Sequence, residues 1–196
     1  MIAHLRGKLL SKHPNQAIVE AGGVGYDVNI SVPTFSSLPD AGSEVALFIH
    51  MHVREDALSL YGFLQTADKT LFEKLISVSG IGPKLANTIL SGMPETSQIV
   101  NAIRSNDLTR LTRIPGVGKK TAERMVLELR DKFPPSGSEP SPRIATTPVR
   151  VDVISALINL GYKQGEIEKT LSGMPSDGRP ETFDLLFREV MGRLSK

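Results

Sequence analysis

The sequence predicts an α+β protein of consecutive small domains: a five-stranded β-barrel of the OB type, an all-α region, a flexible linker and a three-helix domain. Three observations support this prediction. Residues 1–63 are short runs rich in β-branched residues, interrupted by Gly, Pro, Asn and Asp. Residues 64–133 change to the spacing of amphipathic helices. Residues 134–148 hold five prolines and three serines and have little to bury.

The composition limits the class of protein. At 40% hydrophobic and 22% charged residues, the 196-residue chain has the composition of a globular protein. It contains no cysteine, which excludes a disulfide framework and a zinc–thiolate site. The start, MIAHLRGKLL, lacks the apolar segment of a signal peptide, and no run reaches the ~20 apolar residues of a membrane span. We therefore expect a cytoplasmic protein with no membrane partner.

Charge is distributed unevenly along the chain. The net charge is only +2, yet residues 1–63 hold 4 Lys and Arg against 6 Asp and Glu, whereas residues 64–133 hold 11 against 7. An anionic partner is therefore expected to bind the helical region.

In residues 1–63, five runs predict strands, with Gly-Gly-Val-Gly at 22–25 supplying the positive φ of a tight turn. A short helical crossover is predicted at 33–39. Five strands in about sixty residues favour a small barrel, with a sandwich fragment as the alternative. We expect most of its aromatic rings to be core rather than a platform for stacking bases. The predicted strands are residues 3–13, 16–21, 25–31, 44–53 and 58–63.

The remaining elements are predicted helices. Residues 64–133 contain candidates at 69–77, 83–90, 97–105, 106–113 and 119–133. Residues 149–196 contain candidates at 151–160, which ends at a Gly161 cap, 164–171 and 181–194. The intervening linker, 134–148, would let the small C-terminal domain reach a moving partner while the rest of the chain stays bound elsewhere.

The basic region contains a sequence repeat. VSGIGPKLANTIL begins at Val78, and IPGVGKKTAERMV begins at Ile114. Each copy reads Gly-aliphatic-Gly-x-Lys and opens an amphipathic helix. The recurring pairs are Gly80 and Gly116, Gly82 and Gly118, Lys84 and Lys120, and Ala86 and Ala122.

This repeat has the chemistry of a phosphate site. Paired glycines permit a tight turn and a close approach to another surface. The helix that follows presents unpaired N–H groups and the positive end of its dipole, and the lysine adds a full charge. Such a site holds phosphate without reading base identity. A plain glycine cap between packed helices is the alternative, which two copies disfavour. A nucleotide-binding P-loop fits poorly, because Lys120 stands where Ser or Thr should follow the Gly-Lys pair.

The repeat resembles the helix-hairpin-helix motif, a DNA-binding element without sequence specificity. The tandem pair, placed after a five-stranded barrel and before a linker and a small helical domain, resembles the RuvA family of Holliday-junction-binding subunits over the whole chain. The resemblance is strongest in LRGKL, GGVGYDV, VREDALSLYGF, TLFEKLISVSGIGPKLA and IPGVGKKTAERM.

The resemblance implies a function and its partners. The chain would bind a four-way junction as a homotetramer, an octamer being left open, and hold it open and planar during recombination and DNA repair. It would have no catalytic residue, metal or cofactor of its own. The hexameric RuvB ATPase would drive branch migration, and the RuvC resolvase is a further candidate partner. The residues implied to contact DNA are Gly80, Gly82, Lys84, Gly116, Gly118, Lys119, Lys120 and Thr121.

Two acidic residues, Glu55 and Asp56, lie between two predicted strands and should sit at or near a hairpin tip. One interpretation is a solvated turn. Another is a metal-binding carboxylate pair, although neighbours in an extended chain point to opposite faces. The resemblance implies a third, an acidic pin that surrounds the junction centre. Carboxylates repel phosphates, so a pin would exclude linear duplex from the centre rather than add affinity.

Two other sets of residues have competing interpretations. His50 and His52 share one strand face, and we expect a half-buried or interface role rather than a metal pair, since no third ligand is apparent. In the C-terminal domain, which docks RuvB in this family, the apolar residues form either a partner surface or the domain core. These residues are Leu157, Leu160, Tyr162, Leu186 and Leu194.

The alternative function is a structure-selective DNA-repair nuclease that uses the same phosphate grips. Cleavage of a junction with Mg²⁺ and no partner would support it. A DNA-binding scaffold without junction preference is a third hypothesis.

Overall fold

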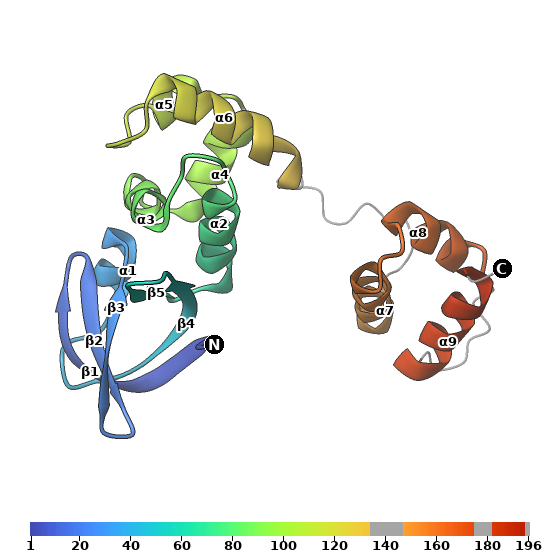
Figure 1. The fold of residues 1–196 in the computed structure, drawn as a ribbon, viewed down its shortest axis with the longest axis horizontal. Helices are drawn as coiled ribbons and strands as arrows, with labels where there is room; N and C mark the ends of the chain where they lie inside the picture. The colour runs from blue at the N-terminus through green and yellow to red at the C-terminus, as the bar shows by residue number, and fades with distance from the viewer. Residues whose placement is uncertain (134–146, 175–181, 195–196) are drawn as a thin grey trace. The chain divides into compact units, whose positions relative to one another are not determined.

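The computed structural model describes residues 1–133, 147–174 and 182–194. The chain divides into two compact units, residues 1–135 and 136–196 (Figure 1). Most of the predicted linker lies outside the described residues. Its last residue, Pro148, is the first residue of helix α7.

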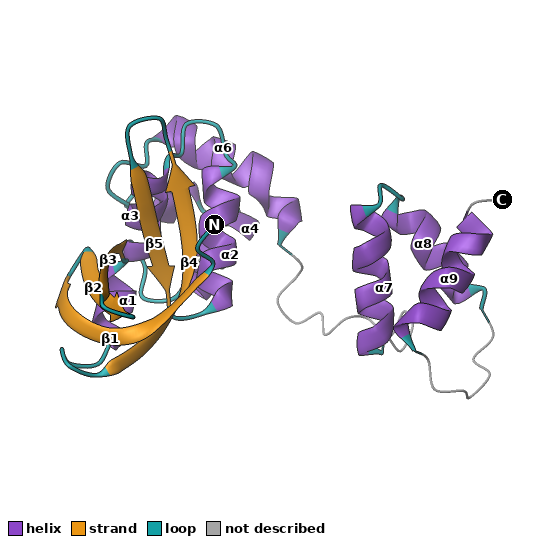
Figure 2. Cartoon of the chain, turned by 60° about the horizontal axis from the view of Figure 1, so that its bottom comes forward, coloured by secondary structure: helices purple, strands orange, loops and turns teal. Residues whose placement is uncertain are grey.

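The N-terminal strands close into a barrel in the order β1-β2-β3-β5-β4 (Figures 1 and 2). Neighbouring strands are antiparallel, except that β3 and β5 are parallel. Alternate side chains such as Leu9, Val19 and Leu47 fill the interior and are fully buried. The closed barrel confirms the predicted architecture. The strands are β1 His4–His13, β2 Gln16–Ala21, β3 Val24–Asn29, β4 Glu44–Val53 and β5 Leu58–Phe63.

The connections of the barrel also agree with the sequence. Gly22 and Gly23, between β2 and β3, have φ values of +62° and +85°. The predicted crossover is helix α1, Val32–Ser37, which joins β3 to β4. The Ser31 hydroxyl accepts a hydrogen bond from the Thr34 N–H at 3.3 Å and so caps this helix.

The second half of the N-terminal unit is helical, as predicted. Helix α5 is shorter than expected from residues 106–113. Asn106 has a φ of +55°, and the Asp107 carboxylate caps the helix by accepting from the Arg110 N–H at 2.9 Å. The helices are α2 Thr66–Ile76, α3 Pro83–Ser91, α4 Thr96–Arg104, α5 Leu108–Leu111 and α6 Lys119–Leu129, which continues as a 3-10 turn, η1 Arg130–Lys132.

Helix α2 joins the barrel to the helical region. Phe72, on α2, is fully buried, and its ring centroid lies 4.9 Å from that of Tyr61 and 5.1 Å from that of Phe63. These two rings come from the end of β5, yet they belong to the hydrophobic core of the helical region. The barrel and the helices are therefore packed together within one compact unit.

The described residues of the C-terminal unit form three helices, α7 Pro148–Asn159, α8 Gln164–Ser172 and α9 Phe183–Leu194. Gly161, with a φ of +94°, follows the end of α7, as its predicted capping role requires. Within the described ranges, no helix combines the length and the apolar character needed to cross a bilayer. The unit has its own core, made of Val153, Leu157, Ile167, Leu171, Leu186 and Val190.

Candidate nucleic-acid interface

The repeated sequence forms two turns of the same geometry, here called hairpin 1 (residues 77–82) and hairpin 2 (residues 113–118). In hairpin 1, the Ile81 N–H donates to the Val78 carbonyl at 3.0 Å. In hairpin 2, the Val117 N–H donates to the Ile114 carbonyl, also at 3.0 Å. The two copies therefore adopt one local fold, α2–hairpin 1–α3 and α5–hairpin 2–α6.

The first glycine of each pair is required by the chain itself. Gly80 and Gly116 have φ values of +90° and +82°, a region in which an L-residue is strained. The aliphatic residues that follow them, Ile81 and Val117, are each 4% exposed. They hold the hairpins against the helical core.

Neither the backbone conformation nor the packing of the chain requires glycine at the second position of each pair. Gly82 and Gly118 cap their helices with φ values of −85° and −81°, which any residue adopts. A Cβ added at either position would meet nothing within 4 Å. These two glycines leave open surface, which another molecule could approach closely.

Each hairpin leads directly into a helix whose first amides are unpaired within the helix. The first intrahelical bonds run from Ala86 N–H to the Gly82 carbonyl and from Ala122 N–H to the Gly118 carbonyl, both at 2.9 Å. The N–H groups before Ala86 and Ala122 point out of the helix ends. Together with the helix dipole, they form an environment suited to an anion.

The two helix starts differ by one donor. Pro83, the first residue of α3, has no N–H, whereas Lys119, the first residue of α6, has one. The helix after hairpin 1 therefore presents the amides of Lys84 and Leu85. The helix after hairpin 2 presents those of Lys119, Lys120 and Thr121.

The predicted lysines lie at these helix starts. Lys84, Lys119 and Lys120 are all exposed. In the part of the chain that the structure describes, no carboxylate lies within ion-pair distance of their ammonium groups. Their charge is available to an external anion and adds to that of the helix ends.

The two hairpins lie close together, because each contacts the helix of the other copy. The Arg124 guanidinium, from α6, donates through Nη1 to the Ser79 carbonyl of hairpin 1 at 2.8 Å. Leu85, from α3, has its Cδ1 only 3.0 Å from where a Cβ on Gly116 would lie. Sequence reasoning missed Arg124, whose only signal was its charge on the second repeat helix.

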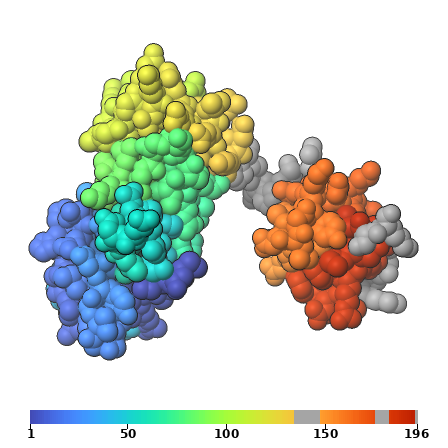
Figure 3. Space-filling model, in the orientation of Figure 1, coloured from blue at the N-terminus to red at the C-terminus, as the bar shows by residue number. Residues whose placement is uncertain are grey.

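The acidic residues Glu55 and Asp56 are exposed in the turn between β4 and β5. Val53 pairs with Leu58 at the end of the strands, and the Arg54 N–H donates to the Ala57 carbonyl at 2.8 Å. The predicted position at a hairpin tip is therefore confirmed. This connection, cyan in Figure 3, projects from the face of the N-terminal unit that is turned to the viewer.

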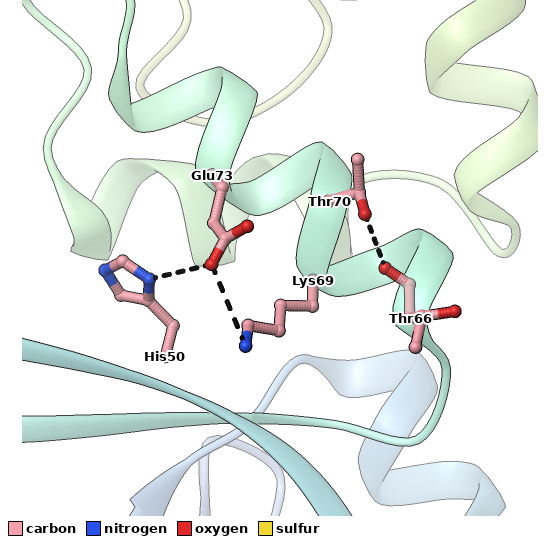
Figure 4. A network of polar contacts seen from close by, with 5 residues as sticks. All are labelled: His50, Thr66, Lys69, Thr70 and Glu73. Atoms are coloured by element: carbon pink, nitrogen blue, oxygen red, sulfur yellow. Dashed lines mark hydrogen bonds and ion pairs between the residues drawn. The ribbon is translucent and has the colours of Figure 1, made fainter. Parts of the chain in front are cut away.

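The two histidines of β4 have contacts within the chain. His50 Nδ1 lies 3.3 Å from Glu73 Oε1 on α2, and the Lys69 ammonium lies 3.9 Å from the same oxygen (Figure 4). His52 Nε2 accepts from Arg54 Nε at 3.2 Å. Among the described residues, no group of three His, Cys, Asp or Glu side chains is arranged to hold a metal ion.

The C-terminal unit corrects part of the predicted partner surface. Leu157 is 0% exposed and Leu186 is 6% exposed, so both are core residues that a partner cannot reach. Leu160 is 60% exposed, and Tyr162 and Leu194 are half-buried at the edge of the core. Other exposed apolar side chains of this unit, which the sequence did not single out, are Val151, Ile158, Phe183 and Leu185.

Comparisons with known proteins agree with this architecture. The family model described as RuvA N terminal domain matches residues 1–62, SAM-like Helix-hairpin-helix tandem matches 72–131, and RuvA, C-terminal domain matches 148–180. A protein of Solibacter usitatus named Holliday junction branch migration complex subunit RuvA is 54% identical over 194 residues, which are 97% of this chain and 98% of the relative. The chain belongs to the RuvA family.

Other RuvA relatives carry the same name. One from Acidobacterium capsulatum is 54% identical over 97% of this chain and 98% of its own length. One from Geotalea daltonii is 47% identical over the full length of both chains. The match to the SAM-like Helix-hairpin-helix tandem spans both hairpins, and the match to the RuvA N terminal domain includes the acidic turn. None of these names describes a nuclease, so the comparisons do not favour that alternative.

Proposed function

We propose that this RuvA-family chain binds four-way DNA junctions and acts as the non-catalytic subunit of a branch-migration complex. The observation that carries the proposal is the pair of hairpins, which have one geometry and lie close together. Each combines an open glycine, unpaired helix amides and an exposed lysine. The names of the relatives support the junction as the form of DNA.

The two hairpins would bind the sugar-phosphate backbone of one duplex arm. Amides at the starts of α3 and α6 would donate to phosphate oxygens, and the lysines would neutralise their charge. The open surface at Gly82 and Gly118 would let the backbones of protein and DNA approach. Because peptide amides contact phosphates rather than base edges, this binding would be independent of base sequence.

The acidic hairpin would select the junction over linear duplex. Glu55 and Asp56 project from the β4–β5 turn, and carboxylates near phosphates are unfavourable. A tetramer would bring four such turns to the junction centre, where the arms diverge. A continuous duplex across that centre would be repelled, whereas the open, planar junction would leave the centre clear.

The C-terminal unit would recruit the RuvB motor. It has a separate core and exposes apolar side chains, among them Leu160. A unit of this kind can bind a partner while the rest of the chain remains on DNA. ATP hydrolysis would take place in the partner, and this chain would supply the geometry of the junction.

Competition between two DNA forms tests the proposal. We expect a labelled four-way junction to be displaced by unlabelled junction at much lower concentration than by linear duplex of equal length and base composition. The junction affinity should also fall steeply with salt. Each phosphate contacted should contribute about −0.9 to the slope of log K against log salt. Equal displacement by both forms, or an affinity independent of salt, would contradict the proposal.

A further inference from the structure

Arg124 connects the two copies of the repeat. It lies on α6, the helix of hairpin 2, yet its Nη1 donates to the carbonyl of Ser79 in hairpin 1 at 2.8 Å. The same nitrogen lies 3.7 Å from where a Cβ on Gly80 would be. The guanidinium therefore contacts the start of the hairpin-1 turn, immediately before the residue with positive φ.

The first copy of the repeat has no equivalent of the Arg124 contact among the described residues. The position equivalent to Arg124 in the first copy is Thr88. The Thr88 hydroxyl donates to the Lys84 carbonyl of its own helix at 3.1 Å and does not reach hairpin 2. Hairpin 2 instead meets an apolar side chain, that of Leu85. Among the described residues, only the second copy has a polar helix side chain that hydrogen-bonds to the hairpin of the other copy.

We propose that Arg124 is a positioning residue that holds hairpin 1 in register with hairpin 2, so that the two hairpins bind one DNA arm as a single unit. The inference rests on the proposed function, because it assumes that both hairpins contact DNA. In this inference, a residue of the second copy, Arg124, determines the position of the hairpin in the first copy. The hydrogen bond between the Arg124 guanidinium and the Ser79 carbonyl lies at the surface.

A direct phosphate contact by Arg124 and a positioning role predict coupling to different lysines. Arg124 lies one helical turn from Lys120, so a direct phosphate contact would act together with hairpin 2. A positioning role instead couples Arg124 to Lys84, which lies on the helix after hairpin 1. Double-mutant cycles separate the two roles, since residues that act through one element are non-additive.

The experiment measures junction affinity of the full-length chain by fluorescence anisotropy. We expect Arg124→Met to weaken binding by about fivefold. In the Arg124→Met background, Lys84→Met should lose at least about half of its effect, whereas Lys120→Met should keep its full effect within about twofold. Arg130→Met is the matched control, because it removes the same charge near the end of α6 and contacts neither hairpin. It should be additive with Lys84→Met. Coupling to Lys120 rather than Lys84 would overturn the proposal.

A second measurement does not depend on DNA. Hydrogen exchange of the unliganded chain reports the Ile81 amide in hairpin 1 and the Val117 amide in hairpin 2, which make equivalent bonds. We expect Arg124→Met to accelerate exchange at Ile81 by about fivefold and to leave Val117 unchanged. Arg124→Lys, which keeps a donor, should restore part of the protection. Unchanged exchange at Ile81 would overturn the inference. If exchange changes but neither Lys84→Met nor Lys120→Met weakens binding, the proposed function fails while the positioning role stands.

Discussion

At the scale of single residues, the two glycines of one hairpin are needed for different reasons, one for backbone conformation and one for open space. Gly80 has a backbone conformation that an L-residue adopts only with strain. Gly82 has an ordinary conformation and empty space where a side chain would be. The first glycine is needed for folding, and the second is needed only if another molecule occupies that space. The sequence predicts both glycines but cannot distinguish them, because the difference lies in φ.

Alanine substitution separates these two requirements. We expect Gly80→Ala to lower the free energy of unfolding by about 1 kcal/mol or more, since the new Cβ is strained. Gly82→Ala should change stability by no more than about 0.5 kcal/mol, yet reduce DNA affinity by about tenfold, because its Cβ would displace a phosphate. Urea denaturation and anisotropy measure the two quantities. Full DNA affinity in Gly82→Ala would show that hairpin 1 does not approach the DNA backbone.

The proposed role of the acidic turn is to lower affinity for linear duplex and so to raise selectivity for junctions. Replacing Glu55 by Lys and Asp56 by Asn removes the repulsion between the turn and phosphates. We expect the double variant to bind linear duplex more tightly, by about tenfold, and to lose most of its preference for junctions. Both residues are exposed, so the fold should be unaffected. A junction preference equal to that of the parent chain would contradict the pin.

At the scale of elements, helix α2 fixes the position of hairpin 1 relative to the barrel. It packs Phe72 against two rings of β5, and its last residue leads into hairpin 1. The polar contact between His50 of β4 and Glu73 of α2 lies at the surface of this joint. The acidic turn and hairpin 1 are therefore built on two elements that pack against each other.

Phe72 tests this joint. We expect Phe72→Ala to destabilise the N-terminal unit by about 3–5 kcal/mol, because a fully buried aromatic ring leaves a cavity. Phe72→Leu keeps most of the apolar volume and should cost clearly less. Thermal and urea unfolding give both values. Similar, small effects of the two substitutions would mean that the joint does not depend on this ring.

Tyr61, in the same cluster, predicts a dependence on pH. Burial raises the pKa of the Tyr61 phenol, while the charge of Arg54 opposes this. The folded chain thus favours the neutral phenol, and this stabilisation is complete below the ordinary tyrosine pKa of about 10 and is lost as the pH rises through the folded-state pKa. We expect Tyr61→Phe to lose less stability than the parent between about pH 8.5 and about pH 11. Equal losses of stability in Tyr61→Phe and the parent, measured by urea unfolding across this pH range, would contradict the prediction.

The sequence predicted the elements better than it predicted their contacts. Strand and helix periodicities are local, so all five strands and the helices lie close to where they were expected. Which core a side chain joins is not local. The rings of Tyr61 and Phe63 end a barrel strand but pack among helices, and Arg124 reaches a carbonyl 45 positions away. Likewise, the apolar face of α7 did not reveal that Leu157 is covered by its own unit while Leu160 is exposed.

At the scale of the whole molecule, the chain consists of two units with separate cores. The predicted DNA contacts and the acidic turn lie in the first unit, and the predicted motor contacts lie in the second. Binding and recruitment should therefore be separable by substitutions or truncations that leave the other unit intact. The domain boundaries at residues 63 and 133 remain predictions of the sequence.

Truncation and one surface substitution test this separation. A chain of residues 1–133 should bind junctions within about twofold of the full-length affinity but should not stimulate the ATPase of the proposed RuvB partner. Leu160→Asp in the full chain should impair stimulation and keep junction binding, because Leu160 is exposed and its loss does not open the core. Circular dichroism verifies that the variant is folded. Stimulation by residues 1–133 alone would place the motor contact in the first unit.

The proline at the start of α3 makes the duplicated site unequal. Since Pro83 brings no hydrogen to its amide nitrogen, the first copy has one donor fewer than the second for a bound oxygen. In the proposed site, the second copy would therefore contribute more of the phosphate contact than the first. A single imino acid would thus set how two repeats that act together share the work of binding one arm.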